Sequence, residues 1–173
     1  MSDLRLDAYI TDVPDFPVPG ILFRDITPLL SSPAALECAI DAMSEPWKHA
    51  NVDLVAAMEA RGFIFAGAIA ARLGAGFVPV RKPGKLPRPT RSIEYVLEYR
   101  NDVLHVHDDA VRPGQRVLVV DDVMATGGTA AAVVGLVRQL GGEVVGLQFL
   151  IELSDLGGRA QLDVPDVRAV VTY

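Results

Sequence analysis

Short apolar runs and longer amphipathic stretches alternate along the first half of the chain. Val52–Met58 and Gly76–Val80 each predict a strand, and Phe63–Leu73 between them has the apolar periodicity of a helix. Pro33 begins an earlier helical pattern, which Pro46 is expected to end because proline lacks the amide hydrogen that a helix needs. The strand–helix–strand order predicts a βαβ unit, in which the two strands are parallel.

The same alternation continues in the second half of the chain. Val117–Val120 is a continuous apolar run that predicts a fully buried strand, and Ala130–Leu140 predicts a helix. Further strands are predicted over Glu143–Leu153 and near Val167–Val171. Because alternating strands and helices favour a parallel sheet covered by helices, the predicted fold class is α/β with a mostly parallel, twisted sheet.

A long basic segment separates these two halves. Arg81–Ser92 holds three prolines and five basic side chains without periodicity, which is typical of an exposed loop. Ile93–Tyr99 and Val103–His107 follow it and are predicted to pair as two strands. The sequence has no repeat or low-complexity tract, so we expect one domain over residues 1–173.

Composition and charge narrow the class of protein. The 173 residues are 50% apolar with a mean hydropathy of +0.30, which favours a compact folded domain over disorder. Sixteen Lys and Arg against 22 Asp and Glu give a net charge of -6, the wrong sign for a protein that coats nucleic acid. The single Cys38 cannot form an internal disulfide, and the apolar runs are shorter than the roughly 20 residues that span a membrane. We therefore expect a cytoplasmic protein with no membrane or nucleic-acid partner.

The most informative segment follows the predicted strand Val117–Val120. Two adjacent acids, Asp121 and Asp122, end that strand, and a glycine-rich turn leads into the next predicted helix. Such a turn points several backbone N–H groups into one concavity, where the helix dipole adds about half a positive charge. We expect a phosphate there, with the acids beside it on sugar hydroxyls, so the implied ligand is a phosphorylated sugar. The turn consists of Ala125, Thr126, Gly127, Gly128 and Thr129.

Other motifs fit this chain less well. A Walker loop needs a lysine after its last glycine, and a dinucleotide fingerprint needs GxGxxG, and neither pattern is present in the turn. An ordinary strand-to-helix turn, in which the glycines only relieve backbone strain, remains the alternative. His105 and His107 alternate on one predicted strand and could imitate a metal pair, but no third ligand lies near them in sequence.

A pyrophosphate on the same sugar would need its own cationic site. In parallel sheets ligands collect where the strands end. The candidates for the cationic site are therefore the basic residues that follow predicted strands: Arg61, Arg81, Lys82 and Lys85. We expect them to face the same cleft as Asp121 and Asp122. Arg61 could instead be a surface arginine that pairs with Glu59. Lys82 and Lys85 could simply keep a loop soluble, and the two acids could merely favour a helix N-terminus.

The segment RVLVVDDVMATGGT, residues 116–129, resembles the phosphoribosyl pyrophosphate motif of the type I phosphoribosyltransferases. Three further segments narrow the likeness to the adenine phosphoribosyltransferases: residues 16–30, FPVPGILFRDITPLL; residues 59–63, EARGF; and residues 77–87, FVPVRKPGKLP. All four occur in the expected order and spacing. The resemblance covers roughly residues 10 to 160.

The resemblance implies a fold, a reaction and partners. It implies a single-domain type I phosphoribosyltransferase fold with a small N-terminal hood, residues 1–32, that binds the base, and a flexible loop near residues 81–98. The implied reaction transfers the phosphoribosyl group from phosphoribosyl pyrophosphate to adenine, giving AMP and pyrophosphate in purine salvage. It also implies a homodimer and a Mg²⁺ ion held chiefly by the pyrophosphate and ribose of the substrate, without a protein metal site.

The resemblance also assigns roles to residues. Glu98 is the implied contact to purine N7, beside Tyr99, although Arg100 stands where a glycine is common in the family. Main-chain groups of Leu22 and Arg24 would face the adenine edge. It implies a non-proline cis peptide between Glu59 and Ala60. The expected catalytic residues are Glu98, Arg61 and Lys85, and the expected substrate-binding residues are Leu22, Phe23, Arg24, Arg61, Arg81, Lys82, Lys85, Tyr99, Asp121, Asp122, Ala125, Thr126, Gly127, Gly128, Thr129 and Leu153.

Two other functions stay open from the sequence. One is a relative within the same enzyme class that uses hypoxanthine, guanine, xanthine or orotate. The other is a regulator that keeps the phosphate-binding turn but senses the activated sugar without reacting it. The acidic net charge and the presence of Glu98 and Arg61 favour catalysis over regulation.

Overall fold

The computed structural model of the chain describes residues 4–97 and 100–173. The chain forms two compact units, Met1–Ala42 and Met43–Tyr173. The boundary lies near the end of helix α2, Pro33–Ser44, which is followed by a short 3-10 helix η2, Glu45–Trp47. Pro46 therefore ends the predicted helix as expected.

The first unit contains a hairpin that hydrophobic patterning did not predict. A 3-10 helix η1, Leu6–Tyr9, precedes strand β1, Thr11–Pro14, which pairs antiparallel with β2, Leu22–Asp25. A short helix α1, Thr27–Ser31, follows. Both strands are only four residues long and contain no fully buried residue, so they lack the apolar alternation by which a half-buried strand is recognised.

The second unit is built on a five-stranded parallel sheet. Its strands are β3, Leu54–Met58; β4, Gly76–Val80; β7, Arg116–Met124; β8, Glu143–Glu152; and β9, Val167–Thr172, in the spatial order β4-β3-β7-β8-β9. The α/β class and the parallel sheet predicted from the sequence are confirmed. The central strand β7 carries the two acids within its last four residues, so the strand continues past the predicted end at Val120.

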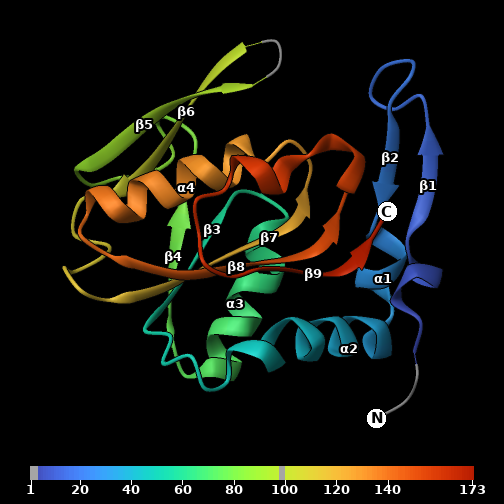
Figure 1. Cartoon of the computed structure of the whole chain (residues 1–173), viewed down its shortest axis with the longest axis horizontal. Helices are drawn as coiled ribbons and strands as arrows, with labels where there is room; N and C mark the ends of the chain where they lie inside the picture. Colours follow the sequence, from blue (N-terminus) through green and yellow to red (C-terminus); the bar gives the residue numbers. More distant parts are fainter. Residues whose placement is uncertain (1–3, 98–99) are drawn as a thin grey trace. The chain divides into compact units, whose positions relative to one another are not determined.

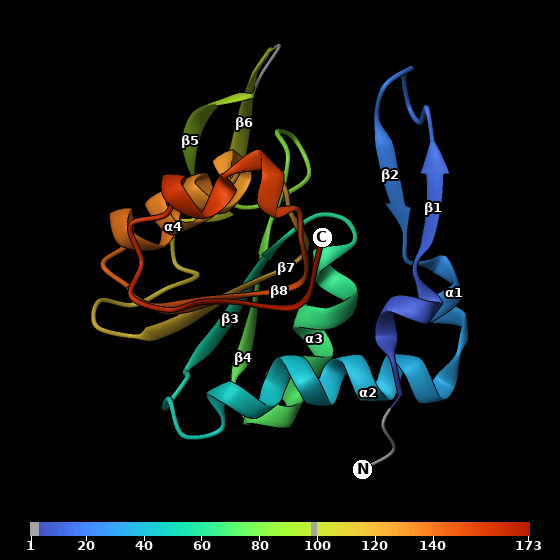
Figure 2. The same ribbon diagram turned by 45° about the vertical axis from the view of Figure 1, so that its right-hand side comes forward.

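Two helices cover opposite faces of this sheet. Helix α3, Gly62–Leu73, contacts β3, β4 and β7, and helix α4, Gly128–Gln139, contacts β3, β7 and β8 (Figures 1 and 2). The buried cluster that joins α4 to the sheet is almost entirely aliphatic and contains Val117, Val119 and Leu147. Burial of such side chains supplies about 1.5–3 kcal/mol each, which makes the sheet a rigid base for the loops at its edge.

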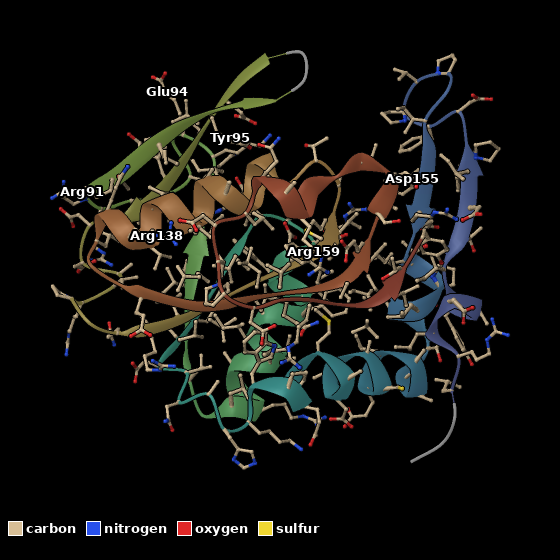
Figure 3. All side chains as sticks on the ribbon, viewed as in Figure 1. Arg91, Glu94, Tyr95, Arg138, Asp155 and Arg159 are labelled. Carbon is tan, nitrogen blue, oxygen red and sulfur yellow. The ribbon has the colours of Figure 1, made fainter. Side chains whose placement is uncertain are left out.

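A separate antiparallel hairpin packs on the outer side of α4. Strands β5, Thr90–Leu97, and β6, Arg100–His107, confirm the predicted pairing, although β5 begins inside the segment expected to be loop. Tyr95 is buried against α4, whereas Glu94 is exposed, and the two lie on opposite faces of β5 (Figure 3). The loop between β4 and β5 is therefore residues 81–89.

Two short 3-10 helices, η3 (Ser154–Leu156) and η4 (Gly158–Gln161), connect β8 to β9. Trp47 is 3% exposed and donates its indole N–H to Oε1 of Gln148 at 2.8 Å. In the described part of the chain, no helix is long and apolar enough to cross a membrane.

Candidate active site

The loops that follow β3 and β7 enclose a cavity of about 480 Å³ at the carboxyl edge of the sheet. This is where a parallel sheet is expected to place its ligands. The predicted convergence of the Glu59–Arg61 turn with the acid pair and the glycine-rich turn is therefore found. The lining residues are Met58, Glu59, Ala60, Arg61, Asp121, Asp122, Val123, Met124, Ala125, Thr126, Gly127, Gly128, Thr129, Ala130 and Phe149.

The glycine-rich turn lines the cavity and leads into helix α4. Gly127 has a φ of +84°, which an L side chain rarely adopts, and its carbonyl accepts the N–H of Ala131 at 2.9 Å as helix α4 begins. No side chain of the described residues caps the start of α4. The first N–H groups of the helix are therefore available to an anion in the cavity, with the helix dipole favouring negative charge.

The acid pair lies beside this turn at the end of β7. Asp122 is 4% exposed, and among the buried side-chain polar atoms of the described residues its Oδ2 lacks a hydrogen bond. Burial, together with the neighbouring charge of Asp122, raises the pKa of Asp121 well above its usual value, and burial also raises that of Asp122. Two crowded, desolvated carboxylates of this kind are suited to accept hydrogen bonds from a ligand.

Small residues bring the acid pair close to helix α3. A Cβ on Gly62, the first residue of α3, would lie 2.7 Å from Oδ1 of Asp121. The same Oδ1 accepts the N–H of Asp122 at 2.9 Å. A glycine at position 62 is therefore needed for the observed position of the Asp121 carboxylate.

Arg61 contacts the acid pair. Its Nε lies 2.8 Å from Oδ2 of Asp122, and this ion pair offsets part of the burial effect on the pKa of Asp122. The alternative in which Arg61 pairs with Glu59 is not what the structure shows, because Glu59 is occupied by other donors. The arginine therefore lies at the cavity wall, between the Glu59–Ala60 turn and the acids.

Glu59 instead holds the next loop. Its Oε2 accepts hydrogen bonds from Nε and Nη2 of Arg81 at 2.9 and 2.7 Å, and its Oε1 accepts the backbone N–H of Lys82 at 2.8 Å. The Lys82 N–H, and then Arg81, lower the pKa of Glu59 below its usual value. The peptide between Glu59 and Ala60 is cis, as the resemblance implied.

The other three predicted cations, Arg81, Lys82 and Lys85, do not line the cavity. Lys82 Nζ lies 3.5 Å from Oδ2 of Asp102, and Lys85 is exposed, with its carbonyl accepting Nη1 of Arg81 at 3.2 Å. Of the four cations predicted to meet pyrophosphate, Arg61 alone lines the cavity formed by the described residues. Arg81 is joined to that wall through Glu59.

The other predicted residues belong to other segments of the chain. Leu22, Phe23 and Arg24 form strand β2 of the first unit, where Arg24 pairs with Asp12. Leu153 directly follows β8 and donates its N–H to the carbonyl of Met124 at 2.9 Å. Glu98 and Tyr99 lie outside the described residues, so their predicted roles stay predictions.

Phe149 is one of the lining residues that none of the predicted motifs contains, together with Met58 and Ala130. It pairs in register with Asp121 across β7 and β8 and forms part of the cavity wall. The sequence marks it only as one apolar residue within a long apolar strand. Its position could have been found only by knowing the register of two strands that are not adjacent in sequence.

The two histidines have local hydrogen-bonding partners. His105 Nδ1 lies 2.9 Å from the Thr90 hydroxyl, and His107 Nδ1 lies 3.4 Å from the carbonyl of Pro89. Among the residues that the structure describes, no cluster of three or more His, Cys, Asp or Glu side chains could hold a metal ion.

Comparison with known proteins shows which proteins this chain is similar to. Residues 27–169 match the model of the phosphoribosyl transferase domain. The chain is 57% identical over 167 residues to the adenine phosphoribosyltransferase of Thermobifida fusca, covering 96% of this chain and 95% of that protein. The crystal structure of adenine phosphoribosyltransferase from Thermoanaerobacter pseudethanolicus superimposes with a TM-score of 0.94 at 49% identity, covering 97% and 98% of the two chains. The Saccharomyces cerevisiae enzyme, complexed with adenine and an imino-altritol bisphosphate, superimposes with a TM-score of 0.90 at 38% identity, covering 95% and 96%.

Proposed function

Because the chain belongs to the adenine phosphoribosyltransferase family, we propose that it transfers the 5-phosphoribosyl group of phosphoribosyl pyrophosphate to adenine. The products are AMP and pyrophosphate, and the reaction serves purine salvage. One observation of the structure carries the proposal. A glycine-rich helix N-terminus and two adjacent, desolvated carboxylates face the same cavity, which is a combination that suits a sugar phosphate.

The proposal assigns the phosphate end and the sugar of the substrate to different groups. The N–H groups of residues 125–129 hold the 5′-phosphate, and each charge-assisted hydrogen bond contributes about 1.5–3 kcal/mol. Asp121 and Asp122 accept the ribose hydroxyls. As the bond from the anomeric carbon to pyrophosphate breaks and the bond to adenine forms, the sugar gains positive charge, which two nearby carboxylates stabilise.

Arg61 is assigned to the leaving pyrophosphate. It lies at the cavity wall beside Asp122, where a guanidinium can form a bidentate contact with phosphate oxygens. Arg81, Lys82 and Lys85 are proposed to complete the cationic site from the loop 81–89. The Glu59–Arg81 hydrogen bonds support this role by fixing the start of that loop.

Mg²⁺ is proposed as the cofactor. The carboxylates of Asp121 and Asp122 are oxygen donors of the kind that Mg²⁺ prefers, and they face the cavity as a pair. Two carboxylates are too few for a dedicated cage, so the substrate's pyrophosphate and ribose are assigned most of the ligands. When bound, the ion neutralises charge on the pyrophosphate.

The adenine contacts are proposed from the family alone. Main-chain groups of Leu22 and Arg24, with Phe23 as an apolar wall and Leu153 at the pocket edge, are assigned to the base. Main-chain acceptors near the six-position would favour an amino group over a carbonyl. Glu98, beside Tyr99, is assigned to the proton at purine N7.

The organisation of the protein is proposed in the same way. We assign residues 1–173 to one phosphoribosyltransferase domain, with residues 1–32 as the base-binding hood. The protein is further proposed to be a homodimer in the cytoplasm. Light scattering on the purified protein tests the dimer, and fractionation of cells tests the location.

One assay tests the reaction and separates it from its rivals. The protein is incubated with Mg²⁺, phosphoribosyl pyrophosphate and each base in turn, and pyrophosphate release is measured. Turnover with adenine alone supports the proposal. Turnover only with hypoxanthine, guanine, xanthine or orotate would overturn the specificity, and binding of the sugar without turnover with any base would indicate a sensor.

A further inference from the structure

The glycine-rich turn rests directly on a second backbone segment. Gly158, the first residue of η4, lies against the side of the turn formed by Ala125 and Gly127. A Cβ on Gly158 would lie 2.9 Å from the nitrogen of Gly127 and closer still to the carbonyl oxygen of Ala125. A Cβ on Gly127 would in turn overlap the carbonyl of Gly158. Neither position can carry a side chain unless one of the two backbones moves.

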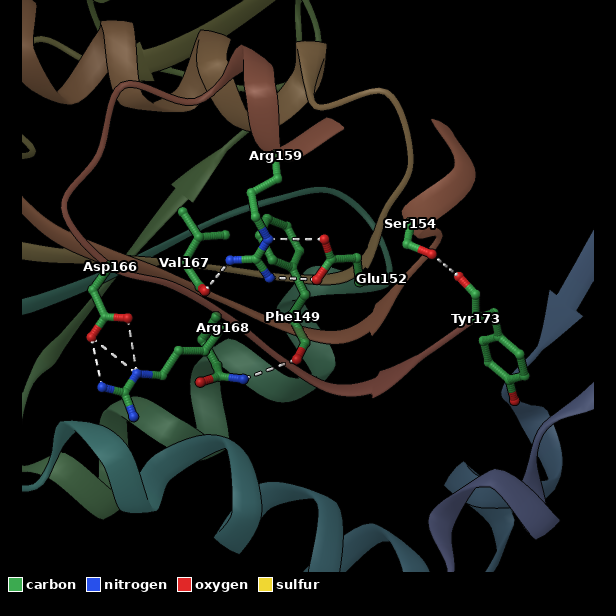
Figure 4. A network of polar contacts seen from close by, with 9 residues as sticks. Phe149, Glu152, Ser154, Arg159, Asp166, Val167, Arg168 and Tyr173 are labelled. Atoms are coloured by element: carbon green, nitrogen blue, oxygen red, sulfur yellow. Dashed lines mark hydrogen bonds and ion pairs between the residues drawn. The ribbon is translucent and has the colours of Figure 1, made fainter. Parts of the chain in front are cut away.

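An arginine next to Gly158 ties this segment to the sheet. The guanidinium of Arg159 donates to both carboxylate oxygens of Glu152, with Nε 3.0 Å from Oε1 and Nη2 bonded to Oε2. Its third nitrogen, Nη1, donates to the carbonyl of Val167, the first residue of β9 (Figure 4). The hydrogen bonds with Glu152 raise the pKa of Arg159 above its usual value. One side chain thus joins η4, the end of β8 and the start of β9.

The carboxylate that receives this arginine is itself well fixed. Glu152 is 8% exposed and is the last residue of β8, and its carbonyl accepts the N–H of Tyr173 at 2.9 Å. The next residue, Leu153, donates its N–H to Met124 in β7 at 2.9 Å. The anchor of Arg159 is therefore part of the rigid sheet, and its position does not depend on the loop it supports.

We propose that Gly158 and the Glu152–Arg159 pair position the phosphate-binding turn, an inference that rests on the proposed function. A turn with two adjacent glycines has many accessible conformations, and only some of them point their N–H groups into the cavity. The backbone at Gly158, fixed by Arg159, excludes the other conformations of the turn before the ligand binds. Such preorganisation increases affinity. Gly158 and Arg159 are positioning residues, since the cavity wall is formed by the turn in front of them.

A nearby ion pair provides a matched control. Arg168 in β9 pairs with Asp166 at 2.8 Å, and its side chain is 48% exposed, compared with 49% for Arg159. Arg168 also lies over the ring of Trp47, and its hydrogen bonds go to Asp166. Loss of Arg168 removes the same charge but leaves the hydrogen bonds of Arg159 to Glu152 and Val167 in place.

The test measures binding of ribose 5-phosphate by calorimetry, which needs no turnover. We expect Gly158→Ala to weaken binding by about tenfold or more, because the added methyl displaces the turn; tenfold corresponds to about 1.4 kcal/mol. Arg159→Ala is expected to weaken it by about three- to tenfold, less than Gly158→Ala, because it loosens the support of the turn without displacing the turn. Arg168→Ala is expected to change it by less than about twofold, as for an exposed ion pair.

Steady-state kinetics then separates positioning from general damage. Arg159→Ala should raise the KM for phosphoribosyl pyrophosphate with a smaller change in kcat and an unchanged KM for adenine. Arg159→Lys, which keeps the charge without the two-pronged geometry, should fall between wild type and Arg159→Ala. If Arg159→Ala or Gly158→Ala fails to fold, Arg159→Lys and Glu152→Gln carry the same test.

The outcomes distinguish this inference from the proposed function. Wild-type protein that makes AMP, together with Arg159 variants that bind ribose 5-phosphate normally, would overturn the positioning role alone. Equal weakening by Arg159→Ala and Arg168→Ala would also overturn it. Wild-type protein that neither binds ribose 5-phosphate nor makes AMP would refute the proposed function, and this inference with it.

Discussion

Two sets of carboxylates line one cavity and differ in how they are partnered. Glu59 accepts three hydrogen bonds, two from Arg81 and one from the backbone of Lys82, and these partners lower its pKa. Asp121 and Asp122 are crowded together and desolvated, and burial raises the pKa of both. The two sets have nearly the same chemistry but opposite electrostatic environments.

This difference separates framework from binding site. A carboxylate whose oxygens are saturated by fixed donors has little left to offer a ligand, so Glu59 serves to hold the loop that begins at Arg81. A buried carboxylate without its full set of donors is costly in the free protein, and a ligand that supplies hydroxyls or a cation relieves that cost. On this argument, substitution of the acid pair damages function, and substitution of Glu59 damages mainly stability.

The largest expected effect follows from removing both charges of the acid pair. The double variant Asp121→Asn/Asp122→Asn should lower kcat/KM by about 100-fold or more, since each lost charge-assisted hydrogen bond costs about 1.5–3 kcal/mol. Pyrophosphate release at saturating adenine measures it. Asp108→Asn/Asp109→Asn is the matched control, since those adjacent acids are exposed and outside the cavity wall. Equal activity of the two double variants would remove the acid pair from the mechanism.

Substitution of Glu59 tests the framework half of the comparison. In Glu59→Gln the amide group faces the donors of Arg81, so hydrogen bonds to a charged group worth about 1.5–3 kcal/mol are lost. The melting temperature at pH 7 should fall by about 2–4 °C for each kcal/mol of unfolding free energy that is lost. The folded-state pKa is lowered, so the stabilisation is present above the unfolded pKa and disappears as pH falls through the folded pKa. Wild type and variant should therefore converge in acid.

The exposed Glu94 on β5 provides the control for this prediction. Glu94→Gln should leave the melting temperature unchanged at every pH, because its side chain is on the outer face of the hairpin (Figure 3). A melting temperature of Glu59→Gln equal to that of Glu94→Gln across the pH range would contradict the framework role of Glu59.

A single substitution in the acid pair should increase stability. Because the folded-state pKa of Asp121 is raised, its ionisation destabilises the fold increasingly as pH rises from the unfolded pKa through the folded pKa. Asp121→Asn should thus melt higher than wild type at pH 7 and close to wild type below about pH 4, near the usual Asp pKa. Thermal melts between pH 4 and 8 measure the difference. A variant that is less stable than wild type at pH 7 would contradict the interpretation that ionised Asp121 destabilises the folded protein.

The smallest effect is expected at an ion pair remote from the cavity. Arg88 pairs with Asp109 at 2.5 Å, but both side chains are more than half exposed, so solvent screens the interaction. Arg88→Ala should leave melting temperature and pyrophosphate release unchanged within error. A clear loss of activity would show that Arg88 takes part in the reaction and would contradict this prediction.

The sequence was sufficient for the elements that periodicity marks. The bounds of β4 agree at both ends, and the turn at residues 125–129 was identified together with its acids because strand, acids, glycines and helix are adjacent in the chain. Elements of this kind can be predicted because the residues that determine them are neighbours in the sequence.

Contacts between distant segments could not be read in the same way. Arg61 was expected to have Glu59 as its alternative partner, yet the register of β3 against β7 brings it to Asp122. Gly158 has no sequence feature that places it behind Gly127. The hairpin β1–β2 was missed because its strands are short, contain no fully buried residue and have no apolar alternation. Each case depends on tertiary packing, which overrides or adds to local preference.

A crystal structure of the protein with AMP tests the central claim most directly. We predict that the 5′-phosphate lies within hydrogen-bonding distance of the backbone N–H groups of residues 125–129, and that the ribose hydroxyls contact Asp121 and Asp122. Phosphate density elsewhere, with the turn contacting no phosphate and the two acids no ribose, would contradict the account.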